Sequence, residues 1–165
     1  GQIKKIYVPH SVLEDTACWL RKYGTKRSEG LVFWAGIETN GPTIITTCVY
    51  PRISESSAGH VRVEAKNGAR MVSEVRKMGL QVLAEVHSHP FPGTGHSWTD
   101  NSFPFAFYKG YLSIVVGDFG EDGMEPLTRC GVHRYENGRF RRLSNSEIQE
   151  LFQVVDDELN LHEDR

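Results

Sequence analysis

The sequence lacks the features that mark several common protein classes. No stretch approaches the roughly 18 apolar residues of a membrane span, and the first residues do not run from basic to apolar as a signal peptide does. Lys and Arg total 19 against 21 Asp and Glu, so the net charge of −2 leaves no basic surplus for nucleic acid. We therefore expect a protein that binds neither membrane nor nucleic acid.

Cysteine is too scarce for a disulfide framework. The chain has 3 cysteines, and Cys18, Cys48 and Cys130 are odd in number and widely separated. This pattern is typical of reduced thiols, which serve as small buried apolar side chains in cytoplasmic proteins. We expect a cytoplasmic location.

Linkers, repeats and low-complexity segments are absent as well. A chain of 165 residues suits one domain, which buries roughly 70% of the surface that its unfolded form exposes. We expect a single domain over residues 1–165.

Two common zinc-enzyme patterns are also missing. The His-Glu-x-x-His pattern does not occur, and neither does the Pro-Cys-x-x-Cys half of the zinc deaminase signature. A metal site in this chain would need a different ligand set.

Such a set is present between residues 85 and 100. On an extended segment His87 and His89 project from the same face, so two imidazole nitrogens can share one cation. Residues 91–96 (FPGTGH) are turn-prone and can bring Asp100 back beside the pair. Two histidines and one carboxylate suit a catalytic zinc, which keeps one coordination position open. Ser97 would face that position.

This string resembles the His-x-His-x7-Ser-x2-Asp signature of the JAMM metalloprotease (JAB/MPN) family, and Pro90 stands where the family usually has a proline. The resemblance implies that one zinc ion per chain is held by His87, His89 and Asp100. It also implies that the Ser97 hydroxyl donates a hydrogen bond to the oxyanion of a tetrahedral intermediate.

A carboxylate is still needed to take a proton from the attacking water and return it to the leaving amine. Glu29 is the candidate general base, at the mouth of the apolar run over residues 28–37. The resembled family has a glutamate seven residues before a glycine, and Glu29 and Gly36 keep that interval. The family's second glycine is replaced by Val32, so the register of this strand stays open.

Glu85 is a rival base, because it shares strand parity with His87 at about 6.6 Å, two residues of strand rise. Its place on the strand of the first ligand favours an outer hydrogen-bond acceptor or a substrate contact instead. His96 could bind a metal adventitiously and is assigned no role. His60 and His133 have no partner at metal-ligand spacing.

Aromatic residues follow Asp100 at a density unusual for a solvated loop. They either pack beneath the site or form one wall of a substrate groove. The groove residues would be Phe103, Phe105, Phe107 and Tyr108.

Hydrophobic periodicity and turn residues predict the order of strands and helices. Strands are expected over residues 4–8, 28–37, 43–50, 80–86, 111–116, 128–135 and 139–143, and helices over 12–23, 64–78 and 144–159. Capping boxes at Ser11 and Ser144 open the first and last helices, a left-handed Gly24 ends the first, and residues 54–59 form a loop.

This order predicts an α/β (α+β) protein with a mixed β-sheet flanked by helices. The core-facing stripe of the helix over residues 64–78 would be Ala65, Ala69, Val72 and Val75. The resemblance implies the JAB/MPN fold, with a core like that of cytidine deaminase.

Together the residues predict a zinc-dependent peptidase or isopeptidase. The resemblance implies cleavage after the C-terminal tail of a ubiquitin-like protein, in precursor processing or in removal from conjugates, and partners from an activating or conjugating enzyme system. Few residues separate Asp100 from Tyr111, so a compact, prokaryote-like member is expected. Two other functions stay open: a catalytically inactive scaffold or interaction module, and a zinc hydrolase of a small-molecule amide.

Overall fold

The computed structural model describes residues 4–97, 100–101, 105–106, 108–159 and 161–162. These residues form an eight-stranded mixed sheet in the order β10-β1-β3-β2-β6-β7-β8-β9. Its strands are β1 (Ile6–Pro9), β2 (Leu31–Glu38), β3 (Thr43–Val49), β6 (Gln81–Ser88), β7 (Leu112–Val116), β8 (Gly131–Glu136), β9 (Arg139–Arg142) and β10 (Phe152–Val155). Each strand that the sequence predicts is present.

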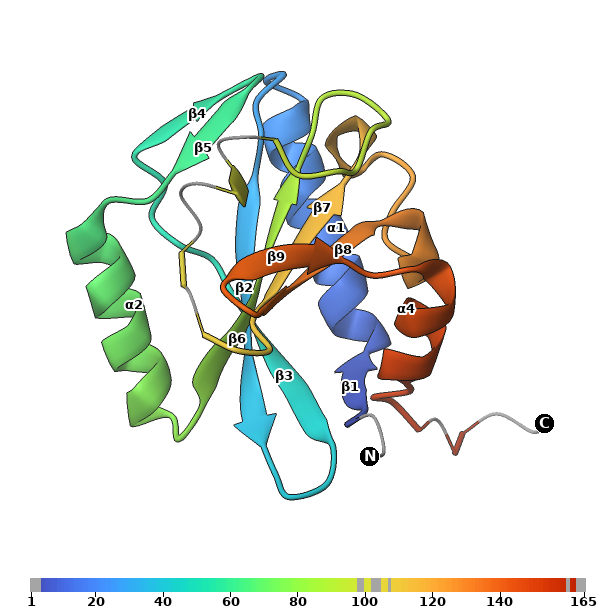
Figure 1. Cartoon of the computed structure of the whole chain (residues 1–165). Helices are drawn as coiled ribbons and strands as arrows, with labels where there is room; N and C mark the ends of the chain where they lie inside the picture. The colour runs from blue at the N-terminus through green and yellow to red at the C-terminus, as the bar shows by residue number, and fades with distance from the viewer. Residues whose placement is uncertain (1–3, 98–99, 102–104, 107, 160, 163–165) are drawn as a thin grey trace.

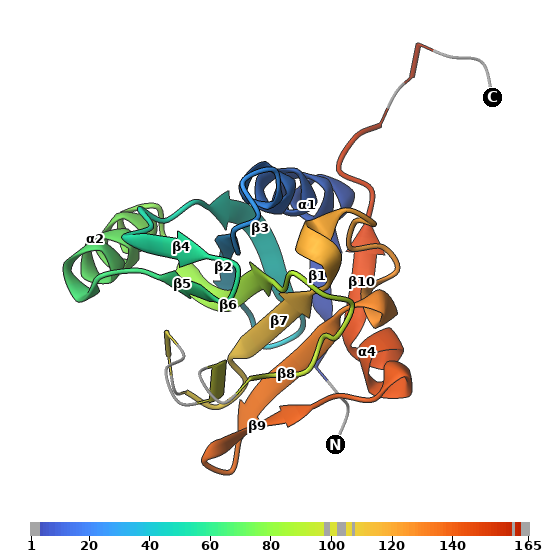
Figure 2. The same cartoon turned by 90° about the horizontal axis from the view of Figure 1, so that it is seen from above.

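Helices cover both faces of this sheet (Figures 1 and 2). Their bounds are α1 (His10–Gly24), α2 (Ala65–Lys77) and α4 (Asn145–Leu151), with 3-10 turns η1 (Asp118–Gly120) and η2 (Leu127–Arg129). Apolar side chains of α1 and α4 pack in one core cluster, and those of α2 pack in a second cluster across the sheet. The predicted fold class, a mixed sheet flanked by helices, is confirmed.

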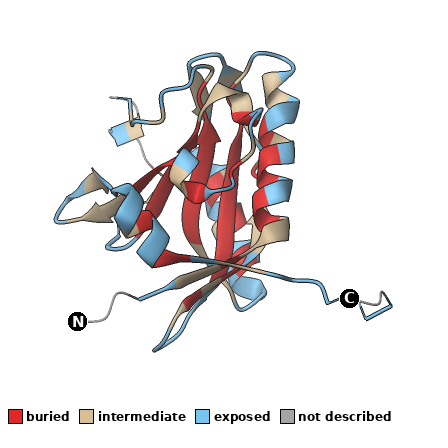
Figure 3. Ribbon diagram, turned by 90° about the vertical axis from the view of Figure 1, so that its right-hand side faces the viewer, coloured by how far each residue is buried: buried red, intermediate tan, exposed pale blue. Residues whose placement is uncertain are grey.

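The middle of the sheet is buried on both faces, as Figure 3 shows. In β2 the residues from Leu31 to Gly36 are all buried, which fits their almost uniformly apolar composition. Trp34 reaches the α1 side, where its indole N–H donates to the Thr16 hydroxyl at 2.9 Å. Gly36 lies at a register shift, and a Cβ there would stand 1.9 Å from the Ile44 carbonyl oxygen. The bulge therefore requires glycine.

The first helix begins and ends differently from the prediction. It starts at His10 directly after Pro9, without a side-chain cap, and the Ser11 hydroxyl bonds to Asp157 instead. Gly24 is the last helical residue and is not left-handed; its missing side chain admits Phe119, whose Cβ would lie 2.6 Å from an added Cβ. The predicted capping box at Ser11 and the left-handed stop at Gly24 are wrong.

The last helix is much shorter than predicted. The capping box is confirmed, since Ser144 accepts from the Glu147 amide and the Glu147 carboxylate accepts from the Ser144 amide. The helix ends at Leu151, however, and Phe152–Val155 forms β10, parallel to β1. Its Val-Val pair favours an extended chain, and pairing with β1 outweighs the helical spacing seen in the sequence.

The segment after β3 is not the plain loop that was expected. It contains a short hairpin of β4 (Glu55–Ser57) and β5 (His60–Arg62), at the upper left of Figure 1. The hairpin is tied to the sheet because the Glu29 amide donates to the Ser57 carbonyl at 2.7 Å. The predicted turn at Asn137 and Gly138 between β8 and β9 is confirmed, and both residues have positive φ.

The cysteines only partly match the expectation of buried apolar thiols. All three are free, and Cys130 is buried, but Cys48 is partly exposed and Cys18 is exposed on the outer face of α1. Among the described helices, none has the length and apolar character to cross a membrane.

Candidate metal centre and its groove

The central strand β6 delivers the histidine pair. It lies between antiparallel β2 and parallel β7, and His87 stands opposite Leu31 on one side and Val115 on the other. His87 and His89 project to one face of the strand, as the alternation of side chains requires. Ser88 between them is fully buried and accepts a hydrogen bond from the Gly30 amide at 2.9 Å. It thereby holds the start of β2 against the ligand strand.

The three predicted ligands, His87, His89 and Asp100, lie together in a close ligand triangle. The Nε2 atoms of His87 and His89 are 3.2 Å apart, and each lies 3.2 Å from a different carboxylate oxygen of Asp100. Ligands at 2.0–2.2 Å from a tetrahedral zinc would be separated by about 3.3–3.6 Å. The spacing and the two-imidazole, one-carboxylate donor set therefore fit a zinc ion.

Outer contacts orient these ligands. Nδ1 of His89 lies 3.0 Å from the Gly93 carbonyl, so it carries the proton and leaves Nε2 free to coordinate. The Ser97 amide donates to Oδ2 of Asp100 at 2.7 Å. Burial opposes ionisation of Asp100, but its hydrogen bonds with His87 and His89 hold the pKa of this carboxyl well below its usual range. The third ligand is thus kept as a carboxylate.

Histidine protonation responds to the same contact. Burial acts to lower the pKa of His87, but the hydrogen bond and charge of Asp100 outweigh it and raise the pKa. A metal ion would have to displace a proton that this pairing favours, so binding is expected to weaken as the pH falls.

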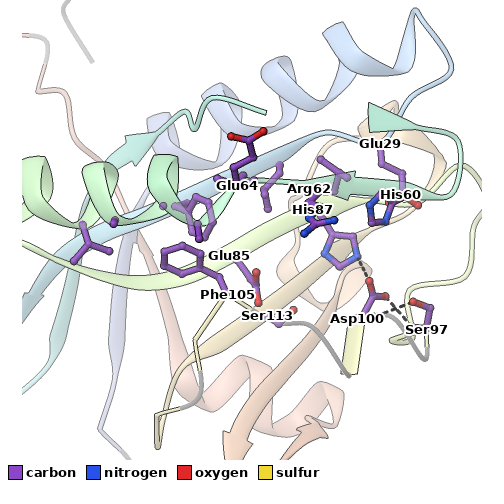
Figure 4. A pocket seen from close by; sticks show the side chains of 18 of the residues that line it. Glu29, His60, Arg62, Glu64, Glu85, His87, Ser97, Asp100, Phe105 and Ser113 are labelled. Carbon is purple, nitrogen blue, oxygen red and sulfur yellow. Dashed lines mark hydrogen bonds and ion pairs between the residues drawn. The ribbon is translucent and has the colours of Figure 1, made fainter. Parts of the chain in front are cut away.

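Ser97 is fixed at the rim of the triangle. Its hydroxyl oxygen accepts a hydrogen bond from the Asp100 amide at 3.1 Å, while its own amide holds the carboxylate (Figure 4). The hydroxyl hydrogen is not used in either bond, so it can be donated to a substrate oxygen. Ser97 lines the same groove as the ligands.

Glu29 comes from the other side of His87. It precedes β2, and continuing the register from Leu31 and His87 sets it opposite His89, on the ligand face. The side chain is buried, and Figure 4 shows it across His87 from Asp100. Burial raises the pKa of Glu29 to about 7, against the charges of the two histidines. A pKa close to neutrality suits a group that takes and returns a proton.

Glu85 lies deeper in the groove. It pairs with Phe33 of β2 and Ser113 of β7, and it is only 9% exposed. Burial raises its pKa to about 7, against the charge of His87 and a hydrogen bond from the Phe105 amide. Its carboxylate therefore has a protein donor and stands apart from the ligand triangle.

Two glycines let residues 92–94 pack closely against the backbone beside β7 and β8. A Cβ on Gly131 would stand 1.8 Å from the Thr94 carbonyl oxygen, and one on Gly117 would stand 2.8 Å from the Pro92 carbonyl oxygen. Main-chain bonds add to this support, since the Asp118 amide donates to the Phe91 carbonyl at 3.0 Å. Residues 91–94 are thus held by close contacts and hydrogen bonds with the main chain of neighbouring segments.

A second histidine pair, which sequence analysis left without a role, supports the same loop. The rings of His96 and His133 stack at 3.7 Å. His96 is also 2.8 Å from the hydroxyl of Ser113 and 2.8 Å from the side-chain oxygen of Asn101. Burial lowers the pKa of both histidines, to about 4 for His96 and about 3 for His133. They are neutral structural groups at physiological pH.

A large groove runs from the ligands towards α2 (Figure 4). Its volume is about 1390 Å³. The outer wall is β5, whose free edge faces the groove because β4 occupies its other edge. The apolar residues along the groove are Leu31, Phe33, Val61, Val63, Ala65, Gly68, Ala69, Val72, Phe91 and Phe105.

The predicted aromatic wall is only partly within reach of this groove. Phe105 lines it and packs on Phe33 with ring centroids 4.6 Å apart. Tyr108 lines a separate cavity of about 370 Å³, and its hydroxyl donates to the Val82 carbonyl at 2.5 Å. Phe103 and Phe107 lie outside the described residues.

Sequence analysis missed most of the groove. The predicted core stripe of α2 is confirmed at Val75 alone, which is buried. Ala65 and Ala69 are exposed and line the groove, whereas Gly68 and Met71 are buried. The small side chains of Ala65, Gly68 and Ala69 could have indicated the groove, because a helix that borders a ligand site needs small residues to leave room for the ligand. His60 also lines the groove, on β5.

Comparisons with known proteins agree with this geometry. Residues 16–128, more than half of the chain, match the family of prokaryotic homologs of the JAB domain. A protein of Sinorhizobium fredii (strain NBRC 101917 / NGR234), named probable metalloprotease y4jG, is 30% identical over 136 residues, which cover 81% of this chain and 82% of the relative.

Two solved structures share the fold. The solution structure of protein DSY2949 from Desulfitobacterium hafniense has a TM-score of 0.66 at 16% identity and covers 95% of this chain and 97% of its own. A solution structure from Salinibacter ruber (strain DSM 13855) has a TM-score of 0.58 at 17% identity, with 94% of each chain covered. The family match and the curated relative support a metal-dependent hydrolase. The chain therefore belongs to the family of prokaryotic homologs of the JAB domain.

Proposed function

We propose that this protein is a zinc-dependent peptidase or isopeptidase that hydrolyses the bond after the C-terminal tail of a ubiquitin-like protein. The observation that carries the proposal is the ligand triangle of His87, His89 and Asp100, with sides of 3.2 Å, set at one end of a long groove beside buried Glu29. The curated relative named as a probable metalloprotease supports the same reaction class.

The roles of the side chains follow from their positions. Bound by His87, His89 and Asp100, zinc would supply Lewis acidity that makes water a nucleophile at neutral pH. Glu29 takes the proton of the attacking water and returns it to the leaving amine. The Ser97 hydroxyl donates to the oxygen of the scissile carbonyl as negative charge develops there.

An extended tail suits the shape of the groove. The free edge of β5 offers main-chain donors and acceptors to one further strand, and the opposite side is the small-residue face of α2. Next to the ligands the groove is lined by Phe91 and Glu29. We therefore expect glycine or another small residue at the scissile bond, where the backbone must approach closely.

The test is a pair of fusions, each a ubiquitin-like domain joined to a reporter, with tails that differ only in the last two residues. Zinc-loaded protein should cleave the Gly-Gly fusion and leave the Leu-Leu fusion intact, and Glu29→Gln protein should cleave neither. Equal cleavage of both fusions would refute the narrow site. Cleavage of neither fusion, by protein that contains one zinc per chain, would refute the peptidase.

The alternatives make different predictions. An inactive scaffold would bind no zinc. The presence of His87, His89 and Asp100 at a spacing that could hold a metal ion argues against this alternative. A hydrolase of a small amide suits a pocket of about 300–1,000 Å³, whereas this groove is larger and bordered by a strand edge. We further propose cytoplasmic action within an activating or conjugating enzyme system, a context that co-purification with such partners would test.

A further inference from the structure

Glu85 is a carboxylate placed where the metal site does not need one. It lines the groove together with Phe33 and Phe105, on the same strand face as His87 but two residues before it. In Figure 4 its side chain lies between Phe105 and Ser113, inside the groove and away from Ser97. Glu85 therefore forms part of the floor of the groove, outside the group of residues proposed to carry out hydrolysis.

This carboxylate has no lysine or arginine partner in the described part of the chain, and the charge of His87 is the largest influence that favours its ionised form. No Lys or Arg forms an ion pair with it, and its one protein hydrogen-bond donor is the Phe105 amide. A carboxylate has room for several donors. Burying such a group is costly unless a charge-bearing donor comes to it.

The surroundings suit a cation on an aliphatic stem. The Phe33 and Phe105 rings pack against each other at 4.6 Å beside the carboxylate. Apolar walls cover the methylene groups of a long side chain, and aromatic rings attract the charged head. Exposed Arg62, Arg76 and Lys77 also line the groove, but beside Glu85 itself an acidic side chain would meet repulsion. A neutral side chain there would leave Glu85 without a cationic partner.

We propose that Glu85 is a specificity-determining residue, the floor of a subsite that takes a lysine or arginine side chain of the substrate tail. The inference rests on the proposed function, because it assumes that a tail lies extended along the groove. Glu85 is two residues from His87, and strands rise about 3.3 Å per residue with alternating side chains. The subsite therefore selects the third residue before the scissile bond.

The test uses labelled tail peptides ending in X-Gly-Gly and the matching reporter fusions, with X as Arg, Lys, Met or Glu. Cleavage is measured with zinc-loaded wild type, and binding by fluorescence anisotropy with Glu29→Gln protein. Arg and Lys should exceed Met by about tenfold to a hundredfold in both measurements, the range of a charged hydrogen bond. Glu should be worst.

Variants of Glu85 complete the experiment. Glu85→Gln should bring Arg and Met within about twofold, and Glu85→Lys should make Glu the preferred residue, each in protein that keeps its zinc and its circular dichroism. Glu74→Gln is the matched control, because Glu74 is an exposed carboxylate of α2 that pairs with Lys77 and does not line the groove. It should keep the wild-type preference.

The outcomes separate the two proposals. Cleavage without preference for a basic residue, or a preference that survives in Glu85→Gln, overturns the subsite and leaves the peptidase standing. Selective binding without cleavage supports the subsite and overturns the peptidase. Absence of binding by all four peptides overturns the subsite.

Discussion

The two ends of the groove are built in different ways. At the metal end, the ligands come from residues 87–100, and every ligand atom has a partner about 3 Å away. At the α2 end, the walls come from β2, β5, α2 and the segment around Phe105, and they are mostly apolar. The first end is specified by local spacing, whereas the second exists only once distant segments are folded together. Changes at the metal end should abolish chemistry, and changes at the other end should alter recognition.

The largest effect is expected from removing a ligand. His87→Ala, His89→Ala or Asp100→Ala should lose bound zinc and reduce activity to background, and a chelator should do the same to wild type. If the ion serves chemistry rather than folding, far-UV circular dichroism should remain close to wild type. Undiminished zinc in these variants would contradict the ligand assignment, and global unfolding would indicate a structural ion.

Replacing the general base should separate chemistry from binding. Glu29→Gln should lower kcat by roughly a hundred- to ten-thousand-fold, the usual contribution of a positioned base, with zinc content unchanged. Glu74→Gln, which removes an exposed carboxylate of α2 outside the groove, should keep wild-type kcat. Activity of Glu29→Gln within a few-fold of wild type would transfer the role to Glu85.

Ser97→Ala should be milder than loss of a ligand. One oxyanion donor contributes about 2.7–4 kcal/mol, or roughly a hundred- to a thousand-fold in kcat. The Asp100 amide also loses its acceptor, so zinc content must be measured beside kcat. An unchanged kcat in zinc-loaded protein would show that Ser97 only supports the loop.

At the other end of the groove, Phe105→Ala should act on binding. Loss of its contact with Phe33 should raise KM by roughly tenfold, equivalent to about 1.4 kcal/mol, with little change in kcat. Steady-state kinetics on the Gly-Gly fusion would measure both constants. A fall in kcat alone would place Phe105 with the chemistry rather than with recognition.

The smallest effect concerns stability and pH. Burial holds the pKa of His133 at about 3 in the folded protein, whereas a histidine of the unfolded chain takes up a proton near pH 6.5. The free energy of unfolding should therefore fall by about 1.4 kcal/mol per pH unit for this group as the pH drops below about 6, and stay flat above 7. His133→Asn should flatten that slope in denaturant titrations; an equal slope in both proteins would show that other groups cause it.

The sequence predicted that His87, His89 and Asp100 come together, because the information for this arrangement is local. The spacing of His87, His89, Ser97 and Asp100 survives folding almost as a unit, since an extended strand fixes the pair and a short turn returns the carboxylate. The apolar run over residues 28–37 likewise indicated a strand, and β2 is buried from Leu31 to Gly36. Glu29 was predicted as the general base from its seven-residue interval to Gly36. The structure adds that the pairing of Leu31 with His87 sets Glu29 on the ligand face.

The errors arose where tertiary pairing decides local structure. Phe152–Val155 has helical spacing of apolar residues, but a partner strand more than a hundred residues earlier makes it extended. Ala65 and Ala69 resembled a core stripe because small apolar residues suit a core, whereas they line a groove. Neither outcome is encoded within a short window of sequence.

The loop seated on Gly117 and Gly131 has a consequence for protein design. Neither residue is a ligand, yet an added methyl group at Gly131 would collide with the Thr94 carbonyl and displace the turn that carries Asp100. Transplanting residues 87–100 into another sheet would therefore fail unless side-chain-free backbone were transferred with them on the adjoining strands. A transplant of this site would therefore need residues from separate segments of the chain, including glycines whose lack of a side chain leaves room for the loop.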